Sequence, residues 1–219
     1  MISETAAVAL ATFFATVGPI DVAAMFAALT LNATPRERLI VAIRGTAIAT
    51  GILLFFAIFG ESVLDGLGIS LAALRTAGGV LLLLIGIDLV FGRSSGATSA
   101  TEAEAEEAAA KPDISVFPLA TPLIAGPGAM GASILLMADT EGDLLLQGVV
   151  IACLLAILAL TLLALIAASQ LQRVLGVTGT QVIRRVFGIL LTALAVQFFF
   201  DGISQSNLLA SAARVFVPA

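Results

Sequence analysis

The sequence predicts an all-α integral membrane protein with six transmembrane helices, arranged as two inverted repeats of three helices each. The first observation is the composition: 60% of the 219 residues are hydrophobic, only 11% are charged, and the mean hydropathy is +1.14. A soluble domain would carry about a quarter charged residues. The second observation is that the apolar residues fall into six runs. A helix needs about 20 residues to cross a bilayer, and each run is close to that length. The third is that the pattern of these runs occurs twice.

One long polar linker divides the six runs into two halves. This linker, residues 93–113, is rich in Ser, Ala and Glu and is expected to be solvated. It separates a first transmembrane repeat, residues 1–92, from a second, residues 114–203, and a C-terminal tail follows at residues 204–219. The expected spans are approximately 5–31, 37–60, 68–92, 114–138, 144–169 and 180–203.

Within each half the three runs show the same features in the same order. The first run contains a Gly-Pro pair, in "TVGPIDVAAM" in the first half and in "LIAGPGAMGA" in the second. A polar turn and an uninterrupted apolar run follow, and an arginine, Arg75 or Arg185, leads the third run. The length of chain from Pro19 to Arg75 is nearly that from Pro127 to Arg185. Because several features recur in one order, we interpret the halves as repeats.

The odd number of spans in each half determines how the repeats are related. After three spans, the second repeat must enter the membrane from the opposite side, which is the inverted repeat found in many secondary transporters. An excess of basic residues marks the cytoplasmic side. We therefore expect a multi-pass protein with a cytoplasmic linker and both termini extracytoplasmic. One side collects Arg36, Arg38, Arg44, Arg93, Lys111, Arg173, Arg184 and Arg185, and the other has only Arg75 and Arg214.

The Gly-Pro pairs interrupt segments that otherwise read as membrane helices. Proline lacks an N–H and clashes with the carbonyl one turn earlier, and glycine lets the chain leave helical geometry at little cost. A break near mid-membrane exposes half-helix ends, which bind charged groups in transporters. For a single pair, a structural kink is the alternative. Because two pairs occur at equivalent places, we predict breaks near residues 17–20 and 125–129 that face each other across a shared site.

The residues around the two breaks are the candidates for solute binding. Asp21 has two open interpretations: it caps the half-helix that begins at Pro19, or it contacts a coupling cation or a solute amine. Arg75 and Arg185 are expected to be interfacial anchors, not ligands. No catalytic or metal-binding residue is predicted. The predicted substrate-binding residues are Thr16, Gly18, Pro19, Asp21, Thr121, Gly126, Pro127, Gly128 and Gln197.

The composition also excludes several kinds of chemistry. The chain has no His, which removes imidazole ligands, Ser-His nucleophiles and His proton relays. The net charge of −5 argues against nucleic acid as a partner. No nucleotide-binding P-loop is present, so transport would be driven by a gradient. No cofactor is expected, and the choice between H⁺ and Na⁺ as the coupling ion stays open.

Two stretches of the second half resemble a known family. "FPLATPLIAGPGAMGASI" from Phe117 and "RRVFGILLTALAVQFFFDGI" from Arg184 are similar to the MarC family, also called UPF0056 or the SnatA-like neutral amino acid transporter family, within the LysE-type superfamily. The resemblance implies a bacterial or archaeal inner-membrane protein with six spans, and some members are implicated in uptake of glycine, alanine and other neutral amino acids. The first half departs from the family's "NPIGN-x-P", because Gly18 replaces the Asn and Asp21 replaces the Gly.

The leading functional hypothesis is a secondary transporter of a small solute, a neutral amino acid such as glycine or alanine, by gradient-coupled alternating access. One alternative is an intramembrane aspartyl-type enzyme with Asp21 and Asp88 as its dyad. The stretch "IGIDL" around Asp88 lacks the second glycine of the "GxGD" signature of such enzymes. A channel or scaffold membrane protein is the other alternative. The expected partners are the lipid bilayer and the solute, and association into a homo-oligomer stays open.

Overall fold

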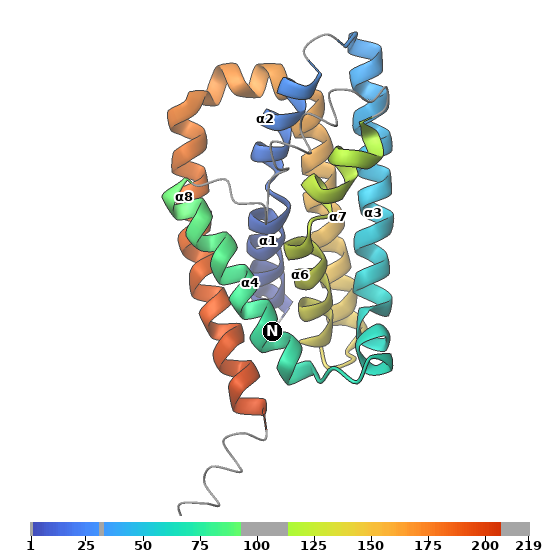
Figure 1. Cartoon of the computed structure of the whole chain (residues 1–219), viewed down its shortest axis with the longest axis vertical. Coiled ribbons are helices and arrows are strands. Elements are labelled where there is room, and N and C mark those ends of the chain that lie inside the picture. Colours follow the sequence, from blue (N-terminus) through green and yellow to red (C-terminus); the bar gives the residue numbers. More distant parts are fainter. Residues whose placement is uncertain (1, 31–32, 93–113, 207–219) are drawn as a thin grey trace, which may run out of the picture.

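The computed structural model describes residues 2–30, 33–92 and 114–206, and every regular element in these ranges is helical (Figure 1). The predicted linker and most of the predicted C-terminal tail lie outside the described residues. The elements are α1 (Ile2–Val17), α2 (Pro19–Leu29), α3 (Pro35–Gly66), α4 (Leu71–Phe91), η1 (Ser115–Ile124), α6 (Pro127–Ala138), α7 (Leu144–Ile166) and α8 (Ala168–Gln205).

Five helical segments of the described chain are long and apolar enough to cross a membrane. A sixth span results if η1 and α6, which are bent by 55° relative to each other, are counted as one. The all-helical, multi-pass membrane fold that the sequence predicts is therefore confirmed at this level. The five segments are Ile2–Ala27, Pro35–Gly66, Leu71–Phe91, Leu144–Ile166 and Gln181–Gln205.

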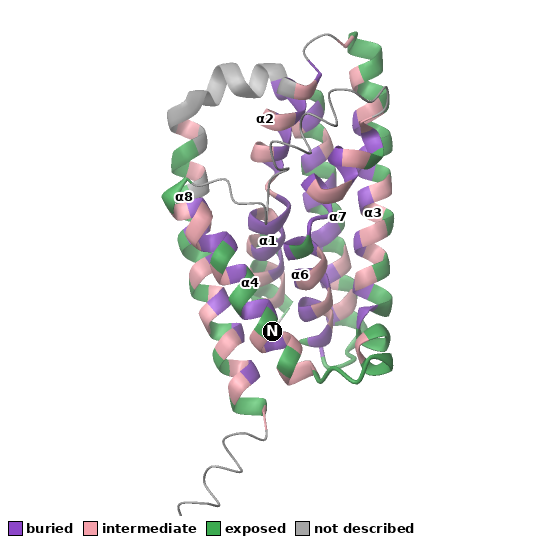
Figure 2. Cartoon of the chain, viewed as in Figure 1, coloured by how far each residue is buried: buried purple, intermediate pink, exposed green. Residues whose placement is uncertain are grey.

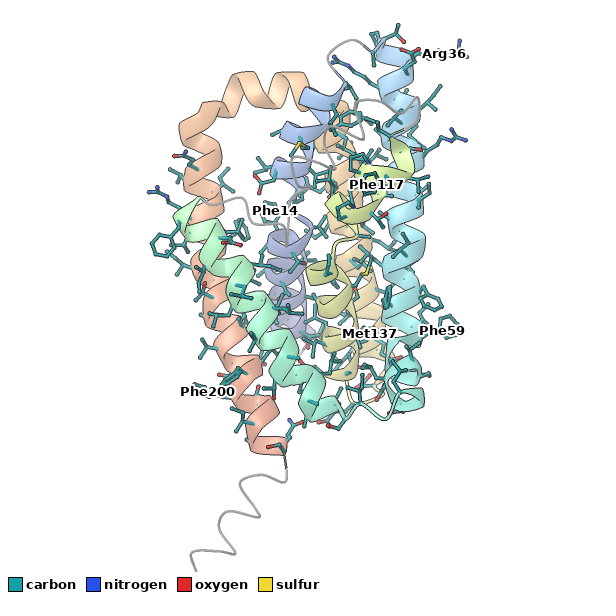
Figure 3. All side chains as sticks on the ribbon, viewed as in Figure 1. Phe14, Arg36, Phe59, Phe117, Met137 and Phe200 are labelled. Carbon is teal, nitrogen blue, oxygen red and sulfur yellow. The ribbon has the colours of Figure 1, made fainter. Side chains whose placement is uncertain are left out.

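Several helix ends lie at two opposite ends of the bundle (Figure 1), and the residues at these two ends differ in charge. We call the first the basic end; it contains the end of α2, the start of α3 and the turn from α7 to α8, and Arg36 is labelled there in Figure 3. We call the second the acidic end; it contains the turn from α3 to α4, the turn from α6 to α7 and the end of α8. The α6–α7 turn carries Asp139, Glu141 and Asp143.

Apolar side chains cover both the inside and the outside of the bundle. Figure 2 shows buried residues on the helix faces that turn toward one another and exposed residues on the outer faces. Phe59 and Phe200 project outward in Figure 3 and are 52% and 60% exposed. Large exposed apolar surfaces mark contact with a membrane or a partner. In this fold the outer surface is suited to lipid chains.

Glycines bring α4 and α8, the third span of each half, into backbone contact. A Cβ added to Gly79 of α4 would lie 2.7 Å from the Phe199 nitrogen of α8. A Cβ added to Gly202 of α8 would lie 2.5 Å from the Thr76 nitrogen of α4. Real Cβ atoms do not approach so closely, so only glycine fits at these two positions. Small residues at helix interfaces are the usual means of close packing in a membrane, where no hydrophobic driving force acts between helices.

Candidate functional site

The first Gly-Pro pair separates α1 from α2 with little change in the path of the chain. Gly18 has φ 61° and ψ 59°, a left-handed conformation that side chains other than glycine rarely adopt. Its N–H donates to the Phe14 carbonyl and its own carbonyl accepts from the Val22 N–H, both at 3.0 Å. Pro19 is the first residue of α2, where a missing N–H would have had no helical partner. The two helices therefore still form one apolar span.

The second Gly-Pro pair lies after an irregular segment and at a sharp bend. Gly126 is extended, with φ −79° and ψ 168°, and Pro127 begins α6. The preceding segment, η1, is interrupted at Phe117 and Thr121, which have φ of −131° and −132° and extended ψ. Each of these residues precedes a proline, and a following proline disfavours the helical conformation. The second junction is therefore a longer departure from helical geometry than the first.

The first turn of α6 packs against the last turn of α1. A Cβ added to Gly128 would lie 2.4 Å from Ile85 Cδ1 and 4.0 Å from the Thr16 methyl carbon. Thr16 is buried, and its hydroxyl donates to the Thr12 carbonyl at 2.8 Å, within its own helix. Thr16 and Gly128, one predicted site residue from each half, therefore lie close together, and the Thr16 hydroxyl already has a partner.

A small cleft lies beside the first junction, between α1, α2, α4 and α8. Its volume is about 20 Å³, enough for about one water molecule. Gly18 and Asp21 line it, and the rings of Phe14 and Phe187, which also line it, lie 4.0 Å apart between centroids. Ligand pockets of about 300 Å³ or more are typical for small organic molecules. This cleft alone is therefore too small to hold an amino acid.

The remaining predicted site residues lie elsewhere. Thr121 is half-buried, and its hydroxyl donates to a carbonyl of its own segment at 3.3 Å. Gly126 is buried and Pro127 is exposed. Gln197 is exposed on α8, and its amide donates to the Asp201 carboxylate at 3.0 Å. None of these four residues lines the cleft at Asp21.

A buried ion pair at the acidic end was missed by the sequence analysis. Arg75 in the first turns of α4 is only 7% exposed, and its guanidinium lies 2.6 Å from the carboxylate of Asp139, the residue after α6. It also donates to the side-chain oxygen of Gln205 at the end of α8. The expectation that Arg75 is an interfacial anchor was therefore wrong, because it is buried and connects three helices. The sequence indicates only that this side carries two basic residues, Arg75 and Arg214, together with the acidic turn "DTEGD", and it does not identify which of them pair.

The pKa of Asp139 reflects two opposing influences. Burial raises the pKa of this carboxyl above its ordinary value of 3.8, and the nearby charges of Asp201 and Glu141 raise it further. The charge and the hydrogen bond of Arg75 lower the pKa but do not cancel the effect of burial. The ion pair can therefore be broken by protonation at a less acidic pH than an exposed aspartate would require.

A larger cleft, of about 360 Å³, lies at the basic end between α2, α3 and the turn that joins α7 to α8. It includes Thr30, the residue that follows α2, and Arg38 in the first turns of α3. Sequence reasoning missed it because its walls come from segments far apart in the chain. Within the described residues, no three His, Cys, Asp or Glu side chains lie together as a metal site would require.

Comparison with known proteins gives a consistent result over nearly the whole chain. The sequence pattern of the MarC family integral membrane proteins matches residues 4–206. A UPF0056 membrane protein of Methanocaldococcus jannaschii is 40% identical over 197 residues, which cover 89% of this chain and 94% of that protein. One of Archaeoglobus fulgidus is 34% identical over 194 residues, or 89% and 90% of the two chains. The UPF0056 membrane protein YhcE of Escherichia coli is 34% identical over 192 residues, 87% of each chain. No solved structure gives a significant match.

Proposed function

The chain belongs to the MarC family of integral membrane proteins, and from that premise we propose that it is a secondary transporter of a small solute, a neutral amino acid such as glycine or alanine. The observation that carries the proposal is the contact between the two Gly-Pro regions, in which Gly128 lies against Thr16. Interrupted helices that meet inside a bundle are how many transporters form a binding site. The relatives are named as membrane proteins, which is consistent with the proposal.

The two halves, residues 1–92 and 114–203, act in this proposal as an inverted repeat. α4 and α8 support it, because Arg75, Gly78 and Gly92 are each separated from Arg185, Gly188 and Gly202 by the same number of residues. The close glycine contacts between these two helices lie where the halves meet. Rocking of one half against the other about such a contact would expose the site to each side in turn.

The two ends of the bundle suggest which conformational state of a transport cycle the structure represents. The Arg75–Asp139 ion pair joins α4 to the end of α6 at the acidic end, and the larger cleft lies at the basic end. Excess basic residues favour the basic end as cytoplasmic, with both termini extracytoplasmic. We therefore assign this conformation to a state that is closed toward the outside of an inner or plasma membrane.

Uptake into proteoliposomes tests the function directly. Purified protein reconstituted with an imposed H⁺ or Na⁺ gradient should concentrate radiolabelled glycine or alanine, and protein-free vesicles should not. Absence of gradient-driven uptake or of solute exchange for a panel of neutral amino acids, with the protein correctly inserted, would contradict the proposal.

Replacement of Asp21 tests its role in coupling. Asp21→Asn keeps the shape of the side chain and removes its charge, so a coupling role predicts loss of concentrative uptake with exchange retained. Asp143→Asn is the matched control, because Asp143 caps α7 by accepting from the Leu145 N–H at 2.8 Å, and Asn caps a helix almost as well. The control should transport normally. Normal gradient-driven uptake by Asp21→Asn would remove Asp21 from the site.

Thiol labelling tests the orientation. A cysteine at Ser95, in a Cys153→Ser background, should resist a membrane-impermeant reagent in intact cells and react after the cells are opened. Labelling in intact cells would reverse the assignment of the two ends.

A further inference from the structure

One face of α6 packs against α4 from the second Gly-Pro pair to the acidic end (Figure 1), and we call this contact the α4–α6 seam. Near the pair, Ile85 of α4 fills the space that a side chain at Gly128 would need. Further along α6 the relation is reversed, because Leu135 fills the space beside Gly78 of α4. The two contacts are equally far apart along both helices, so they belong to one regular antiparallel packing.

The ion pair between Arg75 and Asp139 is the contact of this seam nearest the acidic end. Arg75 lies about one turn before Gly78, and Asp139 lies about one turn after Leu135, so the pair continues the same row of contacts. The two other contacts are apolar and do not respond to charge. The ion pair is therefore the part of the seam that a change in protonation can break.

The two partners of the ion pair differ in their access to water. The Asp139 side chain is 34% exposed, so protons from the medium can reach it, whereas the Arg75 side chain is 9% exposed. The Nε–H of Arg75 is buried without an acceptor, and a second nitrogen of its guanidinium donates to Gln205 of α8. A buried cation that loses its counter-charge is strongly destabilised. Protonation of Asp139 would therefore favour entry of water around Arg75.

The charged groups around Asp139 favour this protonation. Burial raises the pKa of Asp139, and the charges of Asp201 on α8 and Glu141 in the same turn raise it further, against the lowering effect of Arg75. Arg75 is the only Lys or Arg at the acidic end within the described residues. The other acids at this end of the elements around α6 are exposed: Glu4 of α1, Glu61 and Asp65 of α3, and Asp143 before α7.

The helices on each side of the seam are joined to one another. Gly79 and Gly202 bring α4 and α8 into backbone contact, and Gln205 of α8 holds Arg75 of α4. On the other side, Ile134 of α6 fills the space beside Gly60 of α3. An opening of the seam would therefore separate α6 and α3 from α4 and α8, and α6 would pivot at the bend where it begins.

We propose that the α4–α6 seam is the extracytoplasmic entrance to the transport site and that protonation of Asp139 opens it. A proton from the medium binds a carboxylate oxygen of Asp139, while Arg75 keeps its charge and stays with α8. The seam leads from the acidic end to Gly128 and Thr16, where the two Gly-Pro regions meet. The role of the opening rests on the proposed transport function, but the opening itself is measured without any solute.

Thiol labelling of the purified full-length protein measures the opening. Ala132→Cys in a Cys153→Ser background places a thiol on the seam face of α6, because Ala132 lies one turn after Gly128 and is 1% exposed. Asp139→Asn removes the negative charge as protonation does, and adding it at constant pH should raise the labelling rate about tenfold. Lowering the pH from about 7.5 to about 5 should raise the rate when Asp139 is present and not in Asp139→Asn.

Three controls separate an opening of the seam from other effects. Each rate is divided by that of Leu67→Cys, which is 68% exposed at the same end, so that the change in thiolate content with pH cancels. Asp143→Asn removes a neighbouring exposed charge and should change the rate at Ala132→Cys by less than about twofold. Ala42→Cys is buried in α3 toward the basic end, and its rate should not change with Asp139→Asn.

A second position keeps the test decisive if Ala132→Cys does not fold, because Leu135→Cys reports on the same seam. An unchanged rate with Asp139→Asn, an equal rise at Ala42→Cys, or a pH response that persists in Asp139→Asn would overturn the proposal. Labelling needs no solute, so a failure of uptake in proteoliposomes is distinguishable from a failure of the seam to open.

Discussion

An arginine contacts the residue that follows a short helix at both the acidic and the basic end of the bundle, but the group that it contacts differs. At the acidic end, Arg75 pairs with the Asp139 carboxylate at the end of α6. At the basic end, Arg38 donates to the Thr30 carbonyl at the end of α2. Both α2 and α6 begin at the proline of a Gly-Pro pair, and in each case the residue that follows the helix contacts an arginine of another helix.

This difference determines how the contact at each end responds to a change in pH. A carboxylate can be protonated, so the ion pair between Arg75 and Asp139 is lost when the pH is low enough to protonate Asp139. A backbone carbonyl does not titrate, so the contact of Arg38 persists whatever the pH. Protonation of Asp139 therefore weakens the ion pair at the acidic end, whereas pH does not change the Thr30 carbonyl at the basic end. Four predictions test this contrast, from the largest expected effect to the smallest.

Removal of Arg75 should have the largest effect on stability. Arg75→Met leaves the Asp139 carboxylate without its cation and the Gln205 side chain without its donor. Loss of one partner of a buried pair costs about 3–5 kcal/mol, and because the Asp139 side chain is 34% exposed we expect about 2 kcal/mol. Chemical unfolding in detergent measures the loss. A loss below about 0.5 kcal/mol would show that the pair does not stabilise this end.

Removal of both partners should restore part of that loss. In Arg75→Met/Asp139→Leu no uncompensated charge is left, and apolar replacements of buried pairs are often neutral. We expect the double variant to regain about half of the unfolding free energy lost by Arg75→Met. Strictly additive losses in the double-mutant cycle would mean that the two side chains do not interact.

Removal of Arg38 should cost less than removal of Arg75. Arg38 is half-buried, and Arg38→Met removes its hydrogen bonds to the neutral carbonyl of Thr30 at the end of α2. The net value of such a hydrogen bond is about 1 kcal/mol. The same unfolding measurement applies to both variants. Equal losses for Arg38→Met and Arg75→Met would remove the contrast between the two ends.

The pH dependence that Asp139 contributes should be the smallest effect. Its folded-state pKa is raised above 3.8 by burial, so the folded protein binds this proton more tightly than the unfolded chain. That contribution to stability is fully present below pH 3.8 and is lost as the pH rises through the folded pKa. The unfolding free energy of the original protein minus that of Asp139→Asn should therefore decrease with rising pH. An increase would mean that attraction to Arg75 outweighs burial.

The sequence by itself determined the features that depend on local chemistry. Hydropathy identified the spans, because a bilayer requires long apolar runs wherever they lie in the fold. The prolines marked the starts of α2 and α6, because a missing N–H and a fixed φ act on neighbouring residues only. The motif around Pro127 also indicated the family to which the chain belongs.

Only the tertiary structure decided which distant residues meet. Arg75 was expected to be an anchor because nothing near it in the chain shows that Asp139 lies 2.6 Å away. Gln197 was a candidate from its polarity in an apolar run, but the turn of α8 directs it outward to Asp201. The contact of Thr16 with Gly128 and the cleft at Arg38 likewise arise where separate helices pack. The physical reason is that packing joins surfaces from distant segments, and one sequence contains no direct record of those pairings.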